Sequence, residues 1–120
     1  MALTETTHAG DFLISYGNGN ISFEEVTLIS GQDLDAGTVL GKITASAKYT
    51  RHDEDASDGS QTAVAILLAA TNATAGDTQC TIIARDAEVN GAQLIWADSS
   101  PTPDQVAGAA DLLTKGIVVR

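Results

Sequence analysis

The chain has 120 residues, enough for one domain with one hydrophobic core. Its formal net charge is −10, with 6 Lys and Arg against 16 Asp and Glu, so few cations are available to neutralise phosphates or anionic headgroups. We therefore expect no binding to nucleic acid and none to a membrane. Aromatic residues make up only 4% of the chain, so the core must be built mainly from Val, Ile, Leu and Ala.

Localisation and redox state are read from three sequence features. No charged segment followed by an apolar run opens the chain, and no apolar stretch approaches the roughly 20 residues of a membrane helix. Cys80 is the single cysteine, which excludes an internal disulfide, and its apolar surroundings predict a buried thiol in a strand. These features favour a protein that is made and folded in a cytoplasm.

The N-terminal segment is polar and rich in threonine up to Gly10, which predicts a flexible arm. A short apolar cluster, Phe12-Leu13-Ile14, follows, and a glycine-rich turn from Gly17 to Asn20 interrupts it. Two alternatives are open for this cluster. It packs back on its own domain, or it extends and pairs with the edge of a partner's sheet.

Most of the remaining chain alternates between apolar stretches and turns, which predicts strands. The predicted strands are 21–30, 38–43, 62–70, 78–85, 94–96 and 117–120. In the first of them the apolar phase changes between Phe23 and Val26, which predicts a β-bulge or a bend at Glu24-Glu25. The alanines of 62–70 leave a helix open as an alternative, but the length of the run and its flanking turns favour a buried strand.

The one strong helix signal lies near the C-terminus. Thr102 is a candidate N-cap, Pro103 suits the first helical position, and Gln105 completes a capping box. Four apolar residues follow at helical spacing: Val106, Ala109, Ala110 and Leu113. Gly116 is expected to end the helix. The sequence therefore predicts a mainly β, single small domain with one short helix near the C-terminus.

The acidic loop at 52–58 is the first candidate for a binding site. Compared with the calcium loop of an EF-hand, Asp58 occupies the position of the required glycine and Val64 that of the closing glutamate. We therefore favour a solvated charged loop over a specific calcium site.

Catalytic patterns are also lacking in the sequence. His8 and His52 are the only histidines and show no zinc-ligand spacing, and no serine lies in a nucleophile elbow. We expect no enzyme activity, no catalytic, cofactor-binding or metal-binding residues, no cofactor and no small-molecule substrate.

The ordered series of short segments resembles the lambda-type bacteriophage head decoration (capsid cementing) proteins. The matching pieces are Gly10 to Ser15, Ser22 to Thr27, Gly31 with Leu34, Ala36 to Lys42, Lys48-Tyr49, Asp58 to Ala63, Ile66-Leu67, Arg85 to Val89 and Leu112 to Ile117. The likeness covers nearly the whole chain. One departure is Phe23, where many members have a basic residue.

This resemblance implies a β-clip or β-tulip domain over residues 17–120, preceded by a flexible capsid-binding arm over residues 1–16. It further implies a homotrimer, made in the host cytoplasm, that binds the major capsid protein on the outside of the virion at three-fold and quasi-three-fold sites. There it stabilises the expanded capsid against the pressure of packaged DNA. The arm residues expected to contact the capsid are Thr4, Thr6, Thr7, Phe12, Leu13, Ile14 and Ser15.

An alternative function is a cell-surface or carbohydrate-binding β module of a phage particle. That alternative requires exposed aromatic side chains around Trp96, the lone tryptophan.

Overall fold

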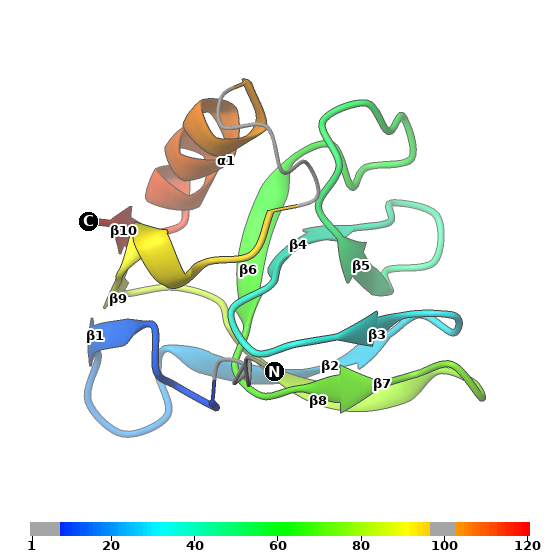
Figure 1. Cartoon of the computed structure of the whole chain (residues 1–120), viewed down its shortest axis with the longest axis horizontal. Helices are drawn as coiled ribbons and strands as arrows, with labels where there is room; N and C mark the ends of the chain where they lie inside the picture. The colour runs from blue at the N-terminus through cyan, green and yellow to red at the C-terminus, as the bar shows by residue number, and fades with distance from the viewer. Residues whose placement is uncertain (1–7, 97–102) are drawn as a thin grey trace, which may run out of the picture.

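The computed structural model describes residues 8–96 and 103–120, with side chains of the second range from Val106 onward. The protein is mainly β with one α-helix near the C-terminus, which confirms the predicted fold class (Figure 1). Five strands close a barrel in the order β2-β5-β4-β6-β8. Their bounds are Phe23–Leu28 (β2), Val39–Lys42 (β4), Tyr49–Arg51 (β5), Ala63–Leu67 (β6) and Thr78–Ile83 (β8).

The other elements lie around this barrel. A three-stranded sheet has the order β1-β9-β10, where β1 is Leu13–Tyr16, β9 is Ala87–Val89 and β10 is Ile117–Val119. β10 runs parallel to β9, and β1 runs antiparallel to it. A two-stranded ribbon joins β3 (Asp33–Leu34) to β7 (Thr71–Asn72), a short 3-10 helix covers Gly91–Gln93, and α1 covers Pro103–Thr114.

Two hydrophobic clusters form the core, and the barrel strands separate them. Neighbouring residues within a strand contribute to different clusters. These pairs are Val39 and Leu40 in β4, Ile66 and Leu67 in β6, and Ile82 and Ile83 in β8. Because successive side chains of a strand point to opposite faces, these strands are covered on both sides. This double burial explains why 62–70 is almost continuously aliphatic, and it confirms the prediction of a buried strand there.

The bulge predicted at Glu24-Glu25 is wrong. β2 pairs with β8 in one unbroken register, from Phe23 opposite Ile83 to Leu28 opposite Thr78. The apolar phase changes because β2 passes from one cluster to the other. Phe23 packs against the cluster that contains Phe12, whereas Leu28 belongs to the cluster that contains Leu40.

The strand predicted at 94–96 is reduced to a single parallel bridge between Ile95 and Thr38. Ile95 accepts a backbone hydrogen bond from Val39 (3.0 Å) and donates one to Gly37 (2.9 Å). The preceding 3-10 helix, capped by the Asn90 side chain, takes up the residues that would have extended this segment into a strand.

The predicted helix is confirmed as α1, and Gly116 follows it with a positive φ of 79°. The face that α1 packs on the barrel is not the predicted apolar stripe. Leu112 is buried, whereas Val106 and Leu113 are 70% and 60% exposed. The capping box predicted at Thr102 and Gln105 lies outside the residues whose side chains are described.

Cys80 is buried in β8, as predicted. Burial raises the pKa of its thiol. No helix in the described part of the chain has the length and apolar character needed to cross a membrane.

Candidate functional site

The predicted capsid-contacting residues fall in two groups. Thr4, Thr6 and Thr7 lie outside the described residues. Phe12, Leu13, Ile14 and Ser15 lie in a segment that enters the fold at Gly10, whose N–H donates to the carbonyl oxygen of Leu68 (3.2 Å).

Phe12 belongs to the protein's own core. Its side chain is fully buried among the cluster that includes Val39, Ile83 and Ile117, and its carbonyl oxygen accepts a hydrogen bond from Asn90 N (2.7 Å). In this structure the segment therefore adopts the first of the two alternatives and packs back on its own domain. Burial within its own domain stabilises Phe12 in this position, because the apolar ring is removed from water.

Leu13–Tyr16 forms β1, which pairs antiparallel with β9, with Leu13 opposite Val89 and Tyr16 opposite Ala87. An irregularity in register between Leu13 and Ser15 lies beside Ile14. Part of the arm predicted through residue 16 is thus held against the domain in this structure, since Gly10, Phe12 and β1 form backbone hydrogen bonds with it.

Three large apolar side chains are exposed in and just after β1: Ile14 (55%), Tyr16 (58%) and Ile21 (53%). We call them the β1 patch. The side chain of Ile21 packs against Gly17, where an added Cβ would lie 2.3 Å from the Ile21 methyl group. The centroid of the Tyr16 ring lies 5.2 Å from that of the Phe23 ring. Tyr16 and Ile21 were not among the site residues predicted from the sequence. Their signal was the pair of large apolar residues that flanks the glycine-rich turn.

β1 is an edge strand. In the order β1-β9-β10 it has one neighbour, and among the described residues no strand pairs with its other edge. An open antiparallel edge presents unpaired N–H and C=O groups that accept an added strand. Apolar side chains beside such an edge add side-chain contacts to that backbone pairing.

Charged groups hold the surroundings of β1 in place. Arg120 pairs with Glu88 (3.0 Å), opposite Ser15 in the register. The hydrogen bond and the charge of Arg120 lower the pKa of the Glu88 carboxyl, and a hydrogen bond from Ser15 adds to this effect. Arg85 pairs with Glu24 and donates to the carbonyl oxygen of Ile21 (2.8 Å), which fixes the backbone of the β1 patch.

A shallow pocket of about 310 Å³ lies next to β1. Its lining includes Ser15, Tyr16, Asp86, Glu88 and Val118. The two carboxylates give this pocket an acidic rim, while Tyr16 and Val118 supply apolar contacts. Such a surface suits a protein segment with small or cationic side chains.

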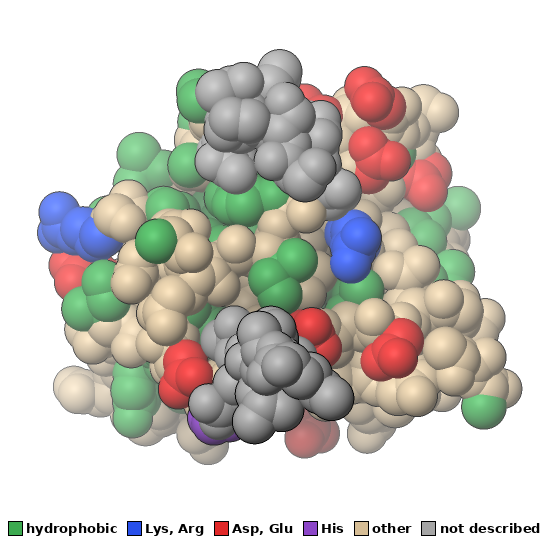
Figure 2. All heavy atoms as spheres, viewed as in Figure 1, with side chains coloured by type: hydrophobic (Ala, Val, Ile, Leu, Met, Phe, Trp, Pro, Cys, Tyr) green, Lys and Arg blue, Asp and Glu red, His purple; other side chains and the backbone are tan. Residues whose placement is uncertain are grey.

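The acidic side chains of 53–58 lie on the loop that follows β5, where Figure 2 shows a group of acidic residues at the upper right. Several of them cap local backbone. Asp53 accepts from Asp55 N (3.0 Å), and Asp58 accepts from both the N–H and the hydroxyl of Ser60. The hydroxyl hydrogen bond is the main cause of a lowered pKa at Asp58. These hydrogen bonds give Asp53 and Asp58 a local structural role in the loop.

Trp96 does not form an exposed stacking platform. Its side chain is half-buried against the core cluster that contains Leu112, and its ring lies edge-on to His52 at 6.3 Å. The helix residue Gly108 approaches it so closely that a Cβ would lie 2.3 Å from the indole. This packing disfavours the carbohydrate-binding alternative.

Among the described residues, the two buried serine hydroxyls bond to backbone groups and to a carboxylate, not to a histidine. Ser22 Oγ donates to the carbonyl oxygen of Asp86 (2.8 Å) and accepts from Gly17 N (2.8 Å), and Ser60 Oγ donates to Asp58. The imidazole of His52 contacts Gln61 O and Glu54. These contacts are structural, and none of them is a nucleophile–base pair.

Comparison with known proteins adds one strong finding. The family model described as bacteriophage lambda head decoration protein D matches residues 2–117, nearly the whole chain. No curated protein matches the chain.

Proposed function

The chain belongs to the bacteriophage lambda head decoration protein D family, and we propose that it binds the outside of the expanded phage capsid as a homotrimer at three-fold and quasi-three-fold sites. In that position it stabilises the shell against the pressure of packaged DNA. Family membership makes the protein a structural component of the phage capsid. Its partner would be the major capsid protein, and its synthesis would occur in the host cytoplasm.

The observation that supports this proposal most is the open edge of β1 with the β1 patch beside it. In the sequence, Thr4, Thr6 and Thr7 precede this edge strand, which begins at Leu13. In our proposal this segment orders on the capsid and adds strand pairing to the capsid protein. Leu13, Ile14 and Ser15 would continue the contact, with Phe12 holding the strand to the domain from within.

The charge of the molecule fits the outer face of a shell. A net charge of −10 disfavours contact with packaged DNA and keeps free copies soluble. Many copies on one particle would convert modest single contacts into a large total stabilisation. We expect this clamp to work without catalysis or cofactor.

Binding to purified expanded capsids tests the proposal. Deletion of residues 1–7 removes the segment ahead of the edge strand while leaving Phe12 and β1 in place. We expect this truncation and Ile14→Asp each to reduce co-sedimentation with capsids at least about tenfold, because strand pairing and a desolvated apolar contact are both lost.

The matched control is Ala75→Asp, which adds the same charge to the exposed turn between β7 and β8, at the far end of the molecule from β1 (Figure 1). It should bind as the wild type does. Wild-type binding by the truncation and by Ile14→Asp would refute the role of this edge. Wild-type protein that fails to bind any expanded capsid of its own phage would refute the function itself.

A further inference from the structure

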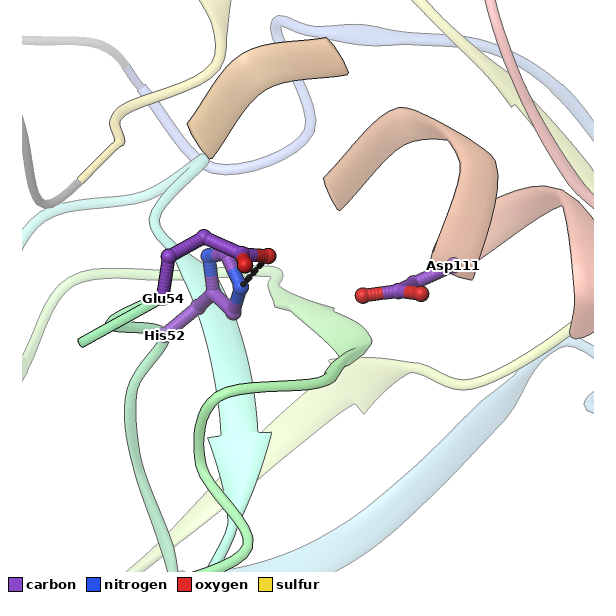
Figure 3. Close-up of side chains that lie close together, drawn as sticks. All are labelled: His52, Glu54 and Asp111. Carbon is purple, nitrogen blue, oxygen red and sulfur yellow. Dashed lines mark ion pairs between the residues drawn. The ribbon is translucent and has the colours of Figure 1, made fainter. Parts of the chain in front are cut away.

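A second cluster of functional side chains lies away from β1. His52 at the end of β5, Glu54 in the following loop and Asp111 on α1 converge on one point (Figure 3). One potential ligand atom from each residue lies within 4.8 Å of the other two. The loop after β5 and α1 therefore present one imidazole and two carboxylates to a common centre.

His52 is the buried member of this cluster. Its side chain is fully buried, and Nε2 lies 3.3 Å from Glu54 Oε1 and 3.1 Å from the carbonyl oxygen of Gln61. Nδ1 has no hydrogen-bond partner in the described part of the chain. The edge-on ring of Trp96, 6.3 Å away, helps to keep water from the imidazole.

The two carboxylates lack a cationic side chain. Asp111 accepts a hydrogen bond from Ala63 N (3.1 Å), and among the described residues no Lys or Arg pairs with Asp111 or Glu54. Two partly buried carboxylates that face a common centre repel one another. A cation held between them would offset this repulsion, and no Lys or Arg in the described part of the chain does so.

The spacing and the donor set fit a transition-metal ion. In a tetrahedral zinc site with bonds of about 2.0–2.1 Å, neighbouring ligand atoms are roughly 3.3–3.4 Å apart. The separation of His52 Nε2 from Glu54 Oε1, 3.3 Å, matches this value. The ligand atom of Asp111 lies within 4.8 Å of both, and Glu54 is 28% exposed, so its side chain has room to adjust to an ion. Imidazole with carboxylates suits Zn²⁺ and its first-row neighbours better than Ca²⁺, which prefers oxygen ligands.

We propose that His52, Glu54 and Asp111 bind one divalent transition-metal ion of the zinc class. The ion would link the loop after β5 to α1, whose Asp111 already accepts a hydrogen bond from Ala63 N at the start of β6. This inference is independent of capsid binding. The site could not be predicted from residue spacing in the sequence. Asp111 lies far from His52 along the chain and comes close to it only because α1 packs on the barrel.

Trp96 provides a site-specific readout, since it is the only tryptophan and lies next to His52. The full chain, purified without a histidine tag, is titrated with Co²⁺ while the tryptophan fluorescence is recorded. We expect saturable quenching at one ion per chain, reversal by excess Zn²⁺, and a melting temperature that rises with the Zn²⁺ concentration.

Two variants remove one ligand each, Glu54→Gln and Asp111→Asn, and both keep side-chain oxygen acceptors. Each should raise the Co²⁺ concentration for half-quenching at least about tenfold. Asp55→Asn makes the same charge change on the exposed part of the same loop, and His8→Ala removes the exposed histidine. Both controls should titrate as the wild type does.

Circular dichroism of the metal-free variants checks that they fold. Absence of quenching up to millimolar Co²⁺ would overturn the proposal. Equal quenching in Glu54→Gln and Asp55→Asn would also overturn it, because the ion would then bind elsewhere.

Discussion

At the residue scale, Gly41 shows how closely two backbone segments approach inside the barrel. A Cβ at this position would lie 2.5 Å from the Cα and the carbonyl oxygen of Ser60. These atoms belong to the backbone and cannot rotate away as a side chain would. Gly41 also lies where the register between β4 and β6 shifts, so the glycine permits both the shift and the contact.

We therefore expect Gly41→Ala to lower the free energy of unfolding by about 2 kcal/mol or more, since overpacking a rigid site typically costs about 1–3 kcal/mol. Urea unfolding monitored by Trp96 fluorescence measures the change. Gly76→Ala is the matched control, because a Cβ at Gly76 meets no atom within 4 Å. Its stability should be unchanged or slightly higher. Equal stability of the two variants would contradict the steric argument.

At the element scale, the sequence predicts the elements whose periodicity or caps are local. α1 and the long barrel strands could be predicted because the residues that define them are contiguous. The strands β3, β7 and β9 have only two or three residues, too few for a period to be recognised. The burial of the two ends of β2 in different clusters likewise cannot be predicted from its own residues, since it depends on which cluster covers each end.

The same limit applies to the candidate site. Phe12-Leu13-Ile14 was recognised as an apolar cluster, but its partner β9 lies far along the chain, so the sequence left packing and extension as equal alternatives. The structure places Phe12 inside and Ile14 outside. An apolar cluster that serves the core and a surface at once cannot be divided between them without knowledge of the register.

This division changes the expected effect of a longer N-terminal deletion. If residues 1–16 formed a wholly flexible arm, removal of residues 1–15 would leave a stable domain. In the structure it removes Phe12 from the core and most of β1 from β9, so we expect a loss of at least about 3 kcal/mol in the free energy of unfolding. Thermal unfolding of the two truncations compares them. The variant that lacks residues 1–7 should have nearly the stability of the wild type. If the variant that lacks residues 1–15 is equally stable, Phe12 is not needed for the stability of the domain.

At the scale of the whole molecule, charge and exposed apolar surface act against one another. Each copy carries a net charge of −10, so copies repel at low ionic strength. The exposed stripe of α1, with Val106 and Leu113, has no partner among the described residues and offers an apolar contact between copies. In the proposed trimer the β1 patch faces the capsid, so the exposed stripe of α1 is the predicted contact between copies.

Analytical ultracentrifugation separates these two surfaces. We expect the trimer fraction of the free protein to rise as sodium chloride increases from about 0.02 to 0.5 M, because screening weakens the repulsion between copies while the apolar contact persists. Leu113→Asp should shift the equilibrium to monomer at every salt concentration, since it places a charge in the proposed contact.

Ile14→Asp, which impairs capsid binding in our proposal, should sediment as the wild type does. If the trimer persists in Leu113→Asp but is lost in Ile14→Asp, the contact between copies is formed by β1 and not by α1. A protein that stays monomeric throughout would confine trimer formation to the capsid surface.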